Sequence, residues 1–218
     1  MSWWDSSRVG YGRQLQSAAV GLAEHAWPVL PGTFWEGRAW CGRPGSRSAS
    51  QAGPLPIPAS GLAAATTDPA RAAAWWSGLP YSILVATGTT VDVIEVAATV
   101  GRQVRTILRA RGVTAPALST TAGRWRFAVR AGQPLRPELD TQPEVVLYGR
   151  GSYVAAPPSD DAHGAQRWEV GPWACRWQLP DPSDVQYAVL TALGLQPAAV
   201  GDPAGELAGE LAMTGSGF

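Results

Sequence analysis

Residues 81–96 read YSILVATGTTVDVIEV and are rich in β-branched and other apolar side chains. Two strands are predicted here, at 81–86 and 91–96, because β-branched residues favour an extended backbone. Thr87 and Gly88 lie between the two runs and are typical of a turn. The sequence therefore predicts that the two strands pair as a β-hairpin.

Apolar residues at helical spacing predict helices before and after this hairpin in the sequence. The predicted helices cover residues 8–26, 70–76, about 100–111 and about 181–193. Ser6 or Ser7 is available as the N-cap of the first, and Asp68 and Asp181 precede prolines at the starts of the second and last. Gly112 is the predicted stop of the third helix.

Further strands are predicted where short apolar runs are bounded by glycine and proline. They lie at 27–31, at 117–121 with 124–130 as one hairpin, and at 145–148 with 152–155 as another. Residues 41–60 are rich in Gly, Pro and Ser and are predicted to form an irregular loop, and residues 198–218 a flexible tail. At roughly 100–200 residues per domain, residues 1–197 are expected to form one domain.

The charge balance restricts the nature of any partner. The 17 basic and 17 acidic residues cancel, and all the basic residues are Arg. A chain without net charge has no global field that attracts it to a phosphate backbone, so any nucleic-acid binding must be local. Arginine suits such local contacts because its guanidinium binds phosphate oxygens in pairs.

The two cysteines and the N-terminal sequence bear on the compartment. Cys41 and Cys175 are far apart in the chain and have no ligand-spaced neighbours, which argues against a zinc site or a disulfide framework. No basic region followed by an apolar run begins the chain, and no apolar stretch reaches membrane-spanning length. A cytoplasmic location without membrane association is therefore expected.

Three segments together resemble the N-terminal domain of bifunctional DNA primase/polymerases, the prim-pol family of the archaeo-eukaryotic primase superfamily. They are AEHAWPVLP at 23–31, ATTDP at 65–69 followed by Trp75-Trp76 and Thr87-Gly88, and GRGSYVAAPPS at 149–159. Their order and spacing match the family over roughly residues 15–195. The resemblance implies an α+β fold with a primase-like core, in which helices flank a mixed or antiparallel β-sheet.

The resemblance also implies a reaction, nucleotidyl transfer, in which carboxylates hold two divalent cations. The family places two acids at alternate positions of one strand, where they share a face. Here Glu95 occupies the first position and Ala97 the second. Asp92 lies near, but a spacing of three residues places it on the other face of a regular strand.

The two remaining family motifs also depart from the pattern. Trp125 stands where the family has a histidine, and indole offers one donor and no acceptor. Val146 stands at the last acid position, and Glu144 is the nearest carboxylate. The sequence thus predicts a catalytically degenerate member with no metal site, no cofactor, and Glu95 as the remnant of the acid pair.

Our first hypothesis is that the domain binds DNA or a nucleotide, or a protein partner, in DNA replication or repair. The candidate nucleic-acid surface consists of Arg124, Trp125, Arg126 and Arg150, which combine guanidinium groups with an aromatic face. The structural alternative for Trp125 is that it fills the core space that the lost site has left.

Two other hypotheses come from different classes of function. An active primase/polymerase would need Asp92 and Glu95 to converge on Mg²⁺ or Mn²⁺. A protein-interaction module would use tryptophan pairs such as Trp3-Trp4 and Trp75-Trp76 as anchors, because buried aromatic residues dominate many interfaces. For Trp75-Trp76 the sequence favours packing in the core.

Overall fold

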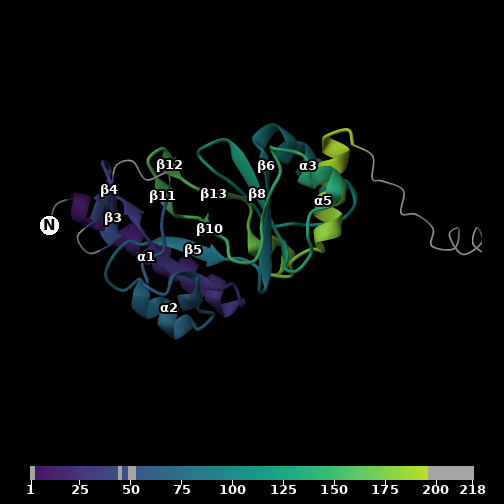
Figure 1. Cartoon of the computed structure of the whole chain (residues 1–218). Helices are drawn as coiled ribbons and strands as arrows, with labels where there is room; N and C mark the ends of the chain where they lie inside the picture. Colours follow the sequence, from purple (N-terminus) through teal and green to yellow (C-terminus); the bar gives the residue numbers. More distant parts are fainter. Residues whose placement is uncertain (1–2, 44–45, 49–52, 196–218) are drawn as a thin grey trace, which may run out of the picture.

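The computed structural model describes residues 3–43, 46–48 and 53–195, and it has an α+β fold in which every strand pair is antiparallel. The helices are α1 (Trp3–Glu24), α2 (Pro69–Trp75), α3 (Ala98–Ala110), α4 (Pro137–Asp140) and α5 (Pro182–Ala192), with 3₁₀ turns η1 (Gly61–Ala64) and η2 (Pro172–Cys175). Helices α1 and α2 lie beside one sheet, and α3 and α5 cover the other (Figure 1).

Two sheets make up most of the strand structure. The larger sheet has the order β13-β7-β8-β6-β9, and the second has the order β1-β5-β10. A small sheet with the order β2-β3-β4 and a β11-β12 pair lie apart from these two. The strands of the two main sheets are β1 (Val29–Gly32), β5 (Ser82–Ala86), β6 (Val91–Ala97), β7 (Ala117–Ser119), β8 (Arg124–Arg130), β9 (Val146–Tyr148), β10 (Tyr153–Ala156) and β13 (Arg167–Val170). The remaining strands are β2 (Phe34–Trp35), β3 (Trp40–Arg43), β4 (Ser46–Ser48), β11 (Asp160–Asp161) and β12 (Gly164–Ala165).

Strand β6 is central because its two faces belong to two different cores. Val91 and Val93 pack in a cluster with residues of α1, α2 and the β1-β5-β10 sheet. Ile94 and Val96 face the opposite way, into a cluster with α3 and α5. Successive side chains of a strand point to opposite faces, so this alternation also fixes the direction in which the polar residues of β6 point.

The predicted helices are present, and their end signals act as expected. Asp68 accepts a hydrogen bond from the Ala70 backbone N–H at 2.9 Å, and Asp181 accepts one from Ser183 at 2.9 Å. Gly112 follows α3 with a φ of 72°, which glycine adopts without strain. One prediction was wrong: α1 begins at Trp3, so Ser6 and Ser7 lie inside the helix and are not its N-cap.

Of the three predicted strand pairings, the 117–130 hairpin is confirmed as β7 and β8. The other two are wrong. Strands β5 and β6 do not pair, nor do β9 and β10, because in each case the chain leaves one main sheet and enters the other. All five residues of β5 and six of the seven in β6 are buried, as expected for strands covered on both faces.

The loop between β5 and β6 contacts the loop between β9 and β10. Thr87 donates a hydrogen bond from its hydroxyl to the Gly149 carbonyl at 2.6 Å. Gly88 has a φ of 94°, and a Cβ built there would lie 2.2 Å from the Arg150 Cα. Glycine is therefore required both for the backbone angle and for the close approach of the second loop.

Residues 41–60 are more regular than predicted, because β3 and β4 fall largely within them. The Trp40 and Cys41 side chains are buried, and the Trp40 ring packs edge to face on Trp35 at a centroid distance of 5.6 Å. Ile57 donates a backbone hydrogen bond to Pro31 at 2.9 Å. Aromatic packing and this non-local hydrogen bond override the loop-like composition.

Several sequence predictions concern parts that the structure does not describe. The tail at 198–218 and the side chains of Trp3 and Trp4 lie outside the described residues. In the described part of the chain, no helix is both long enough and apolar enough to cross a membrane.

The predicted core packing of the Trp75-Trp76 pair is seen at Trp76. Its side chain lies in the core and donates from its indole to the Tyr81 carbonyl at 2.7 Å.

The contact between α3 and β8 gives a test of the fold. A Cβ at Gly101 would lie 2.6 Å from the Trp125 Cβ, closer than packed atoms allow. We expect Gly101→Ala to destabilise the protein by about 1–3 kcal/mol through overpacking, measured by urea unfolding. Gly21→Ala in α1, where nothing lies within 4 Å, is the matched control. It is expected to stabilise by roughly 0.5–1 kcal/mol, and equal effects of the two changes would contradict the packing.

Candidate functional site

The register of β6 with its two neighbours assembles the site. Glu95 lies opposite Arg126 of β8 on one side and opposite Val146 of β9 on the other. Ala97 lies opposite Arg124. Residues directly opposite each other in an antiparallel pair point to the same face, so these five side chains share one face of the sheet. The sequence resemblance predicts the family's acids on this same face.

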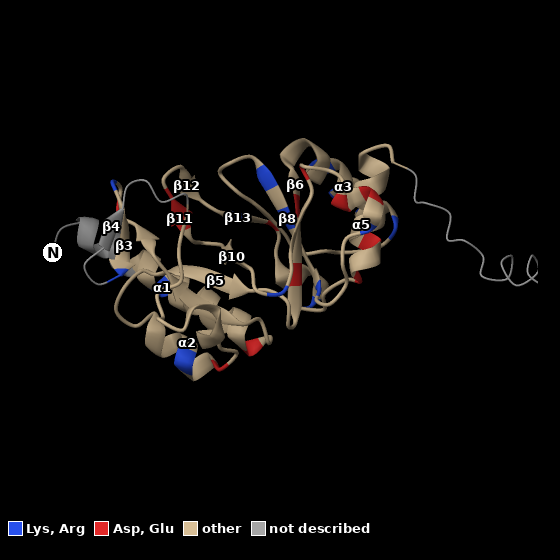
Figure 2. Ribbon diagram, in the orientation of Figure 1, with Lys and Arg blue, Asp and Glu red and all other residues tan. Residues whose placement is uncertain are grey.

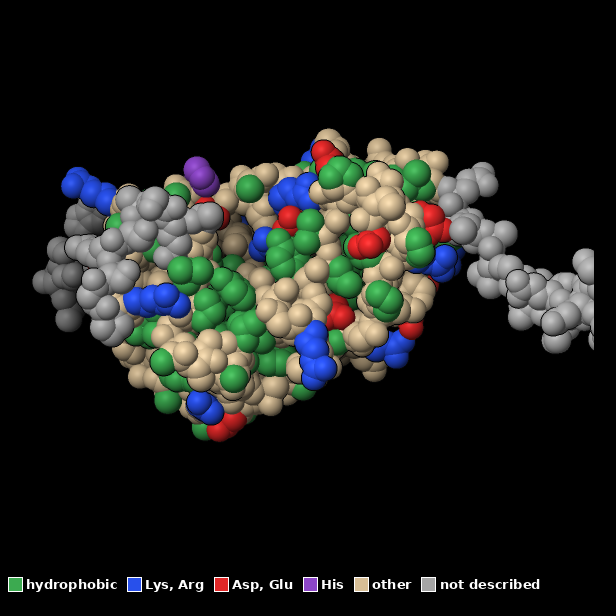
Figure 3. Space-filling model, viewed as in Figure 1, with side chains coloured by type: hydrophobic (Ala, Val, Ile, Leu, Met, Phe, Trp, Pro, Cys, Tyr) green, Lys and Arg blue, Asp and Glu red, His purple; other side chains and the backbone are tan. Residues whose placement is uncertain are grey.

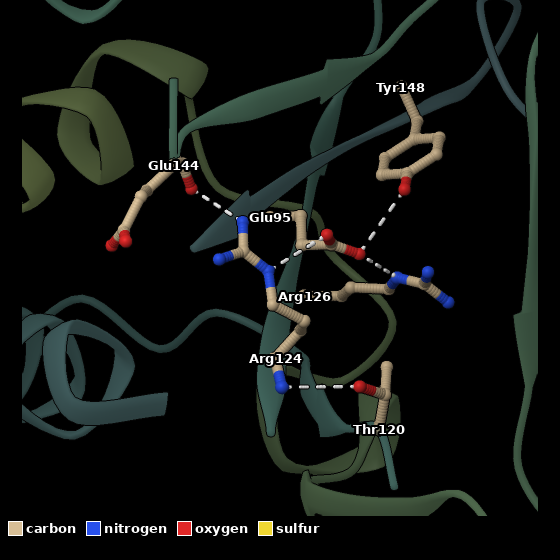
Figure 4. Close-up of polar contacts among 6 residues, drawn as sticks. All are labelled: Glu95, Thr120, Arg124, Arg126, Glu144 and Tyr148. Carbon is tan, nitrogen blue, oxygen red and sulfur yellow. Dashed lines mark hydrogen bonds and ion pairs between the residues drawn. The ribbon is translucent and has the colours of Figure 1, made fainter. Parts of the chain in front are cut away.

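Both carboxylate oxygens of Glu95 are bonded to neighbouring side chains (Figure 4). Arg124 donates from Nε to Oε1 at 3.0 Å, and Arg126 donates from Nε to Oε2 at 2.6 Å. The Tyr148 hydroxyl donates to Oε2 at 3.3 Å. Glu95 is only 6% exposed, and a carboxylate at that depth requires such charge-assisted partners.

The two guanidinium groups differ in the donors that they have left. Arg124 also donates from a terminal nitrogen to the Glu144 carbonyl at 2.5 Å, while the Glu144 carboxylate points away from the cluster (Figure 4). Among the described residues, the terminal nitrogens of Arg126 have no hydrogen-bond or ion-pair partner. Two arginines against one glutamate leave this cluster with a formal charge of +1.

The cluster lies in a cleft of about 660 Å³ between the five-stranded sheet and β10. Charged residues concentrate around the larger sheet and its helices (Figure 2), and basic and acidic side chains meet in the middle of the face drawn in Figure 3. Asp161 also lines the cleft, where its carboxylate accepts from the Thr121 hydroxyl at 2.7 Å and the His163 backbone at 2.8 Å. The cleft is within the usual size range of a small-ligand site.

Asp92 does not join this site. It is 3% exposed, it is not among the residues that line the cleft, and its Oδ2 accepts from the Gly132 backbone N–H at 2.9 Å. The register between β6 and β8 runs without a shift from Val91 to Ala97, so no bulge turns Asp92 toward Glu95.

The predicted nucleic-acid surface is divided by the sheet. Arg124 and Arg126 line the cleft, but Trp125 points to the other face, where it is 5% exposed and packs in the core beneath α3. Trp125 therefore cannot form one surface with the two arginines, because adjacent strand residues point in opposite directions. Arg150 is exposed in the loop before β10, next to the cleft-lining Gly151, but its side chain does not line the cleft.

Two residues that the sequence did not single out also line the cleft. Tyr148 lies two residues after Val146 on β9, so the period of two along a strand could have placed it on the same face. Gln166 lies just before β13, and the sequence gives no signal for it.

The side chains at the site do not fit a pair of divalent cations. Cation sites of this kind need several oxygen ligands, and of the three positions that the sequence resemblance assigns to acids only Glu95 carries a carboxylate. Both its oxygens already accept from guanidinium groups. Across the residues for which the structure gives a description, no group of three or more His, Cys, Asp or Glu could hold a metal ion.

The chain matches the family model for the bifunctional DNA primase/polymerase N-terminal domain over residues 19–184. The protein thus has a primase-type α+β domain. The match covers most of the chain, which therefore belongs to the prim-pol family, and the predicted family and fold class are confirmed. A search of curated proteins found no match to this chain.

The coupling between Glu95 and its arginines can be measured with a double-mutant cycle. We expect Arg126→Gln to lower the free energy of unfolding by about 3 kcal/mol, because it leaves a buried carboxylate with one guanidinium fewer. In a Glu95→Gln background, the same change should cost less than about 1 kcal/mol, as read from urea unfolding curves. Equal costs in the two backgrounds would mean that the ion pair contributes nothing.

Proposed function

We propose that this prim-pol domain binds the phosphate groups of a nucleotide or of DNA in the cleft and has lost nucleotidyl transfer. The observation that carries the proposal is that Arg124 and Arg126 occupy both oxygens of Glu95, the one carboxylate at the family's acid positions. In this arrangement fixed guanidinium groups lie where the family's mechanism needs exchangeable cations.

The remaining donors of the cluster support binding of an anion. The terminal nitrogens of Arg126 carry N–H groups in a planar fork, which matches two oxygens of one phosphate. Asp161 lines the same cleft, so the two acidic and two basic side chains of the lining cancel. Attraction of an anion is therefore local to the terminal nitrogens of Arg126, and the partly enclosed cleft strengthens it relative to open water. Tyr148 and Tyr153 also line the cleft, and the Arg126 guanidinium lies over the Tyr148 ring at 5.2 Å from its centroid.

The same residues argue against catalysis. In a two-cation mechanism the cations stabilise both the attacking and the leaving oxygen, and carboxylates must hold them in place. Ala97 and Val146 have no side-chain oxygen, and Asp92 lies on the other face of the sheet. An active polymerase with a divergent site remains the alternative that an activity assay addresses.

Primer extension tests the loss of catalysis. We expect no incorporation of nucleotides on a primed template with either Mg²⁺ or Mn²⁺, because the site lacks carboxylates for two cations. Metal-dependent extension that is abolished by Glu95→Ala would overturn this part of the proposal.

Binding measurements test the phosphate site. In calorimetry without divalent ions, we expect Arg126→Gln to weaken binding of inorganic tripolyphosphate and nucleoside triphosphates by at least about tenfold.

Arg102→Gln is the matched control, because Arg102 is exposed on α3, on the far side of the sheet from the cleft. It removes the same charge and should leave binding unchanged. Parallel titrations with single-stranded DNA distinguish a free nucleotide from a nucleic-acid strand as the source of the phosphate. Equal effects of Arg102→Gln and Arg126→Gln would contradict the proposed site.

A further inference from the structure

Helix α3 carries a stripe of arginines on the side of the larger sheet that faces away from the cleft. Arg102, Arg105 and Arg109 recur at intervals of three and four residues, so they lie along one side of the helix. All three are exposed, and α3 contains no acidic residue. The helix packs on Trp125, whose side chain points away from the cleft, so the stripe and Arg126 lie on opposite sides of the sheet.

Strand β13 extends this basic surface. Arg167 is exposed and lies opposite Ser119 of β7, which in turn lies opposite Trp125 of β8. Residues directly opposite each other point to the same face, so Arg167 lies on the face of the sheet that α3 covers. The α3 surface therefore consists of Arg102, Arg105, Arg109 and Arg167.

The guanidinium groups of the α3 surface are available to a ligand. Among the described residues, no side-chain hydrogen bond or ion pair is made by Arg102, Arg109 or Arg167. Arg105 approaches Glu169 at 4.0 Å where both side chains are partly exposed, and such pairs contribute little to stability. Four arginines against Glu169 leave the surface with a formal charge of +3.

A hollow beside α3 adds to the groups that can bind phosphate. Arg105 and Arg109 line this hollow of about 290 Å³, together with Thr114. Guanidinium groups and threonine hydroxyls are common donors to phosphate oxygens in complexes with nucleic acids.

The spacing of the arginines suits a polymer of phosphates better than a single anion. Arg102 and Arg109 are separated by about 10 Å along the helix axis, which corresponds to about three backbone steps of a DNA strand. The surface lacks the aromatic rings on which single strands stack, because α3 has none and Trp168 of β13 packs against Trp27 on the other face. A duplex presents two strands of phosphates to the same surface, so it gains more from the positive charge than a single strand does.

We infer that the α3 surface binds the phosphate backbone of duplex DNA without reading its sequence. This second site goes beyond the proposed phosphate site in the cleft and does not depend on it. The chain has no net charge, so the attraction comes from this local concentration of arginines. Membership of a DNA primase/polymerase family favours DNA over an acidic polypeptide as the polyanion.

Fluorescence anisotropy with a labelled DNA duplex of mixed sequence, in the absence of divalent ions, tests this site. For the wild type we expect log K to fall with log salt with a slope of about −3, as expected for three to four neutralised phosphates. The triple variant Arg102→Gln, Arg105→Gln, Arg109→Gln should lower the affinity at least about tenfold at low salt and flatten the slope by about 2–3. Arg109→Gln alone should flatten it by about 1.

Three controls separate this site from other effects. Arg71→Gln removes an exposed arginine from α2, which packs beside the other main sheet, and should leave the affinity and the slope close to those of the wild type. The triple variant should keep the wild-type unfolding midpoint in urea, because its changes are exposed and glutamine is a good helix former. It should also keep the wild-type affinity for tripolyphosphate, which binds in the cleft.

The outcomes distinguish this inference from the proposed function. If duplex binding falls in Arg126→Gln and not in the triple variant, the duplex binds in the cleft, and the inference is wrong while the phosphate site stands. Equal effects of Arg71→Gln and Arg109→Gln would also overturn the inference. If poly-L-glutamate binds as tightly as the duplex and with the same dependence on the α3 arginines, the surface binds acidic polypeptides and the inference is wrong.

Discussion

The antiparallel register of β6 between β8 and β9 is the constraint on which both the fold and the site depend. The period of two along β6 assigns Val91, Val93 and Glu95 to one face and Asp92, Ile94 and Val96 to the other. A shift by one residue would place Glu95 among the apolar side chains beneath α3 and would expose Ile94 in the cleft. The two hydrophobic cores therefore lock the register, and the register brings Arg124 and Arg126 to Glu95.

The cluster is also a structural element, because the buried Glu95 carboxylate needs polar partners in place of water. A carboxylate that is removed from water loses its hydration, and hydrogen bonds from fixed cations are the usual compensation. Tyr148 adds a third donor to the same carboxylate from the neighbouring strand. The polar centre of the cleft is thus held by contacts across three strands, and its geometry is set before any ligand arrives.

Sequence reasoning succeeded where the deciding interactions are local. The helix caps at Asp68 and Asp181 and the β7–β8 hairpin follow from residues close together in the chain, and the opposite faces of Asp92 and Glu95 follow from strand geometry alone. The pairings of β5 and β9 were missed, because β5 pairs with β1 and β10 and β9 pairs with β6, strands that are far from them in the sequence. Trp125 was grouped with its neighbours by composition, although alternation along β8 separates it from them. Gln166 had no sequence signal, because its burial depends on how distant strands assemble.

A guanidinium and a divalent cation neutralise a carboxylate in different ways, and the difference bears on what the cleft can do. A cation is shared between protein and ligand oxygens and can stabilise charge that develops on either side of a breaking bond. A guanidinium is covalently fixed, and its N–H groups bind acceptors along set directions. Arg126 donates from Nε to Glu95, and its two terminal nitrogens are left for another acceptor. The carboxylate therefore orients the guanidinium group. Under the proposed function, a site built in this way would be preorganised to hold an anion in one position, which favours binding but gives no gain specific to a transition state.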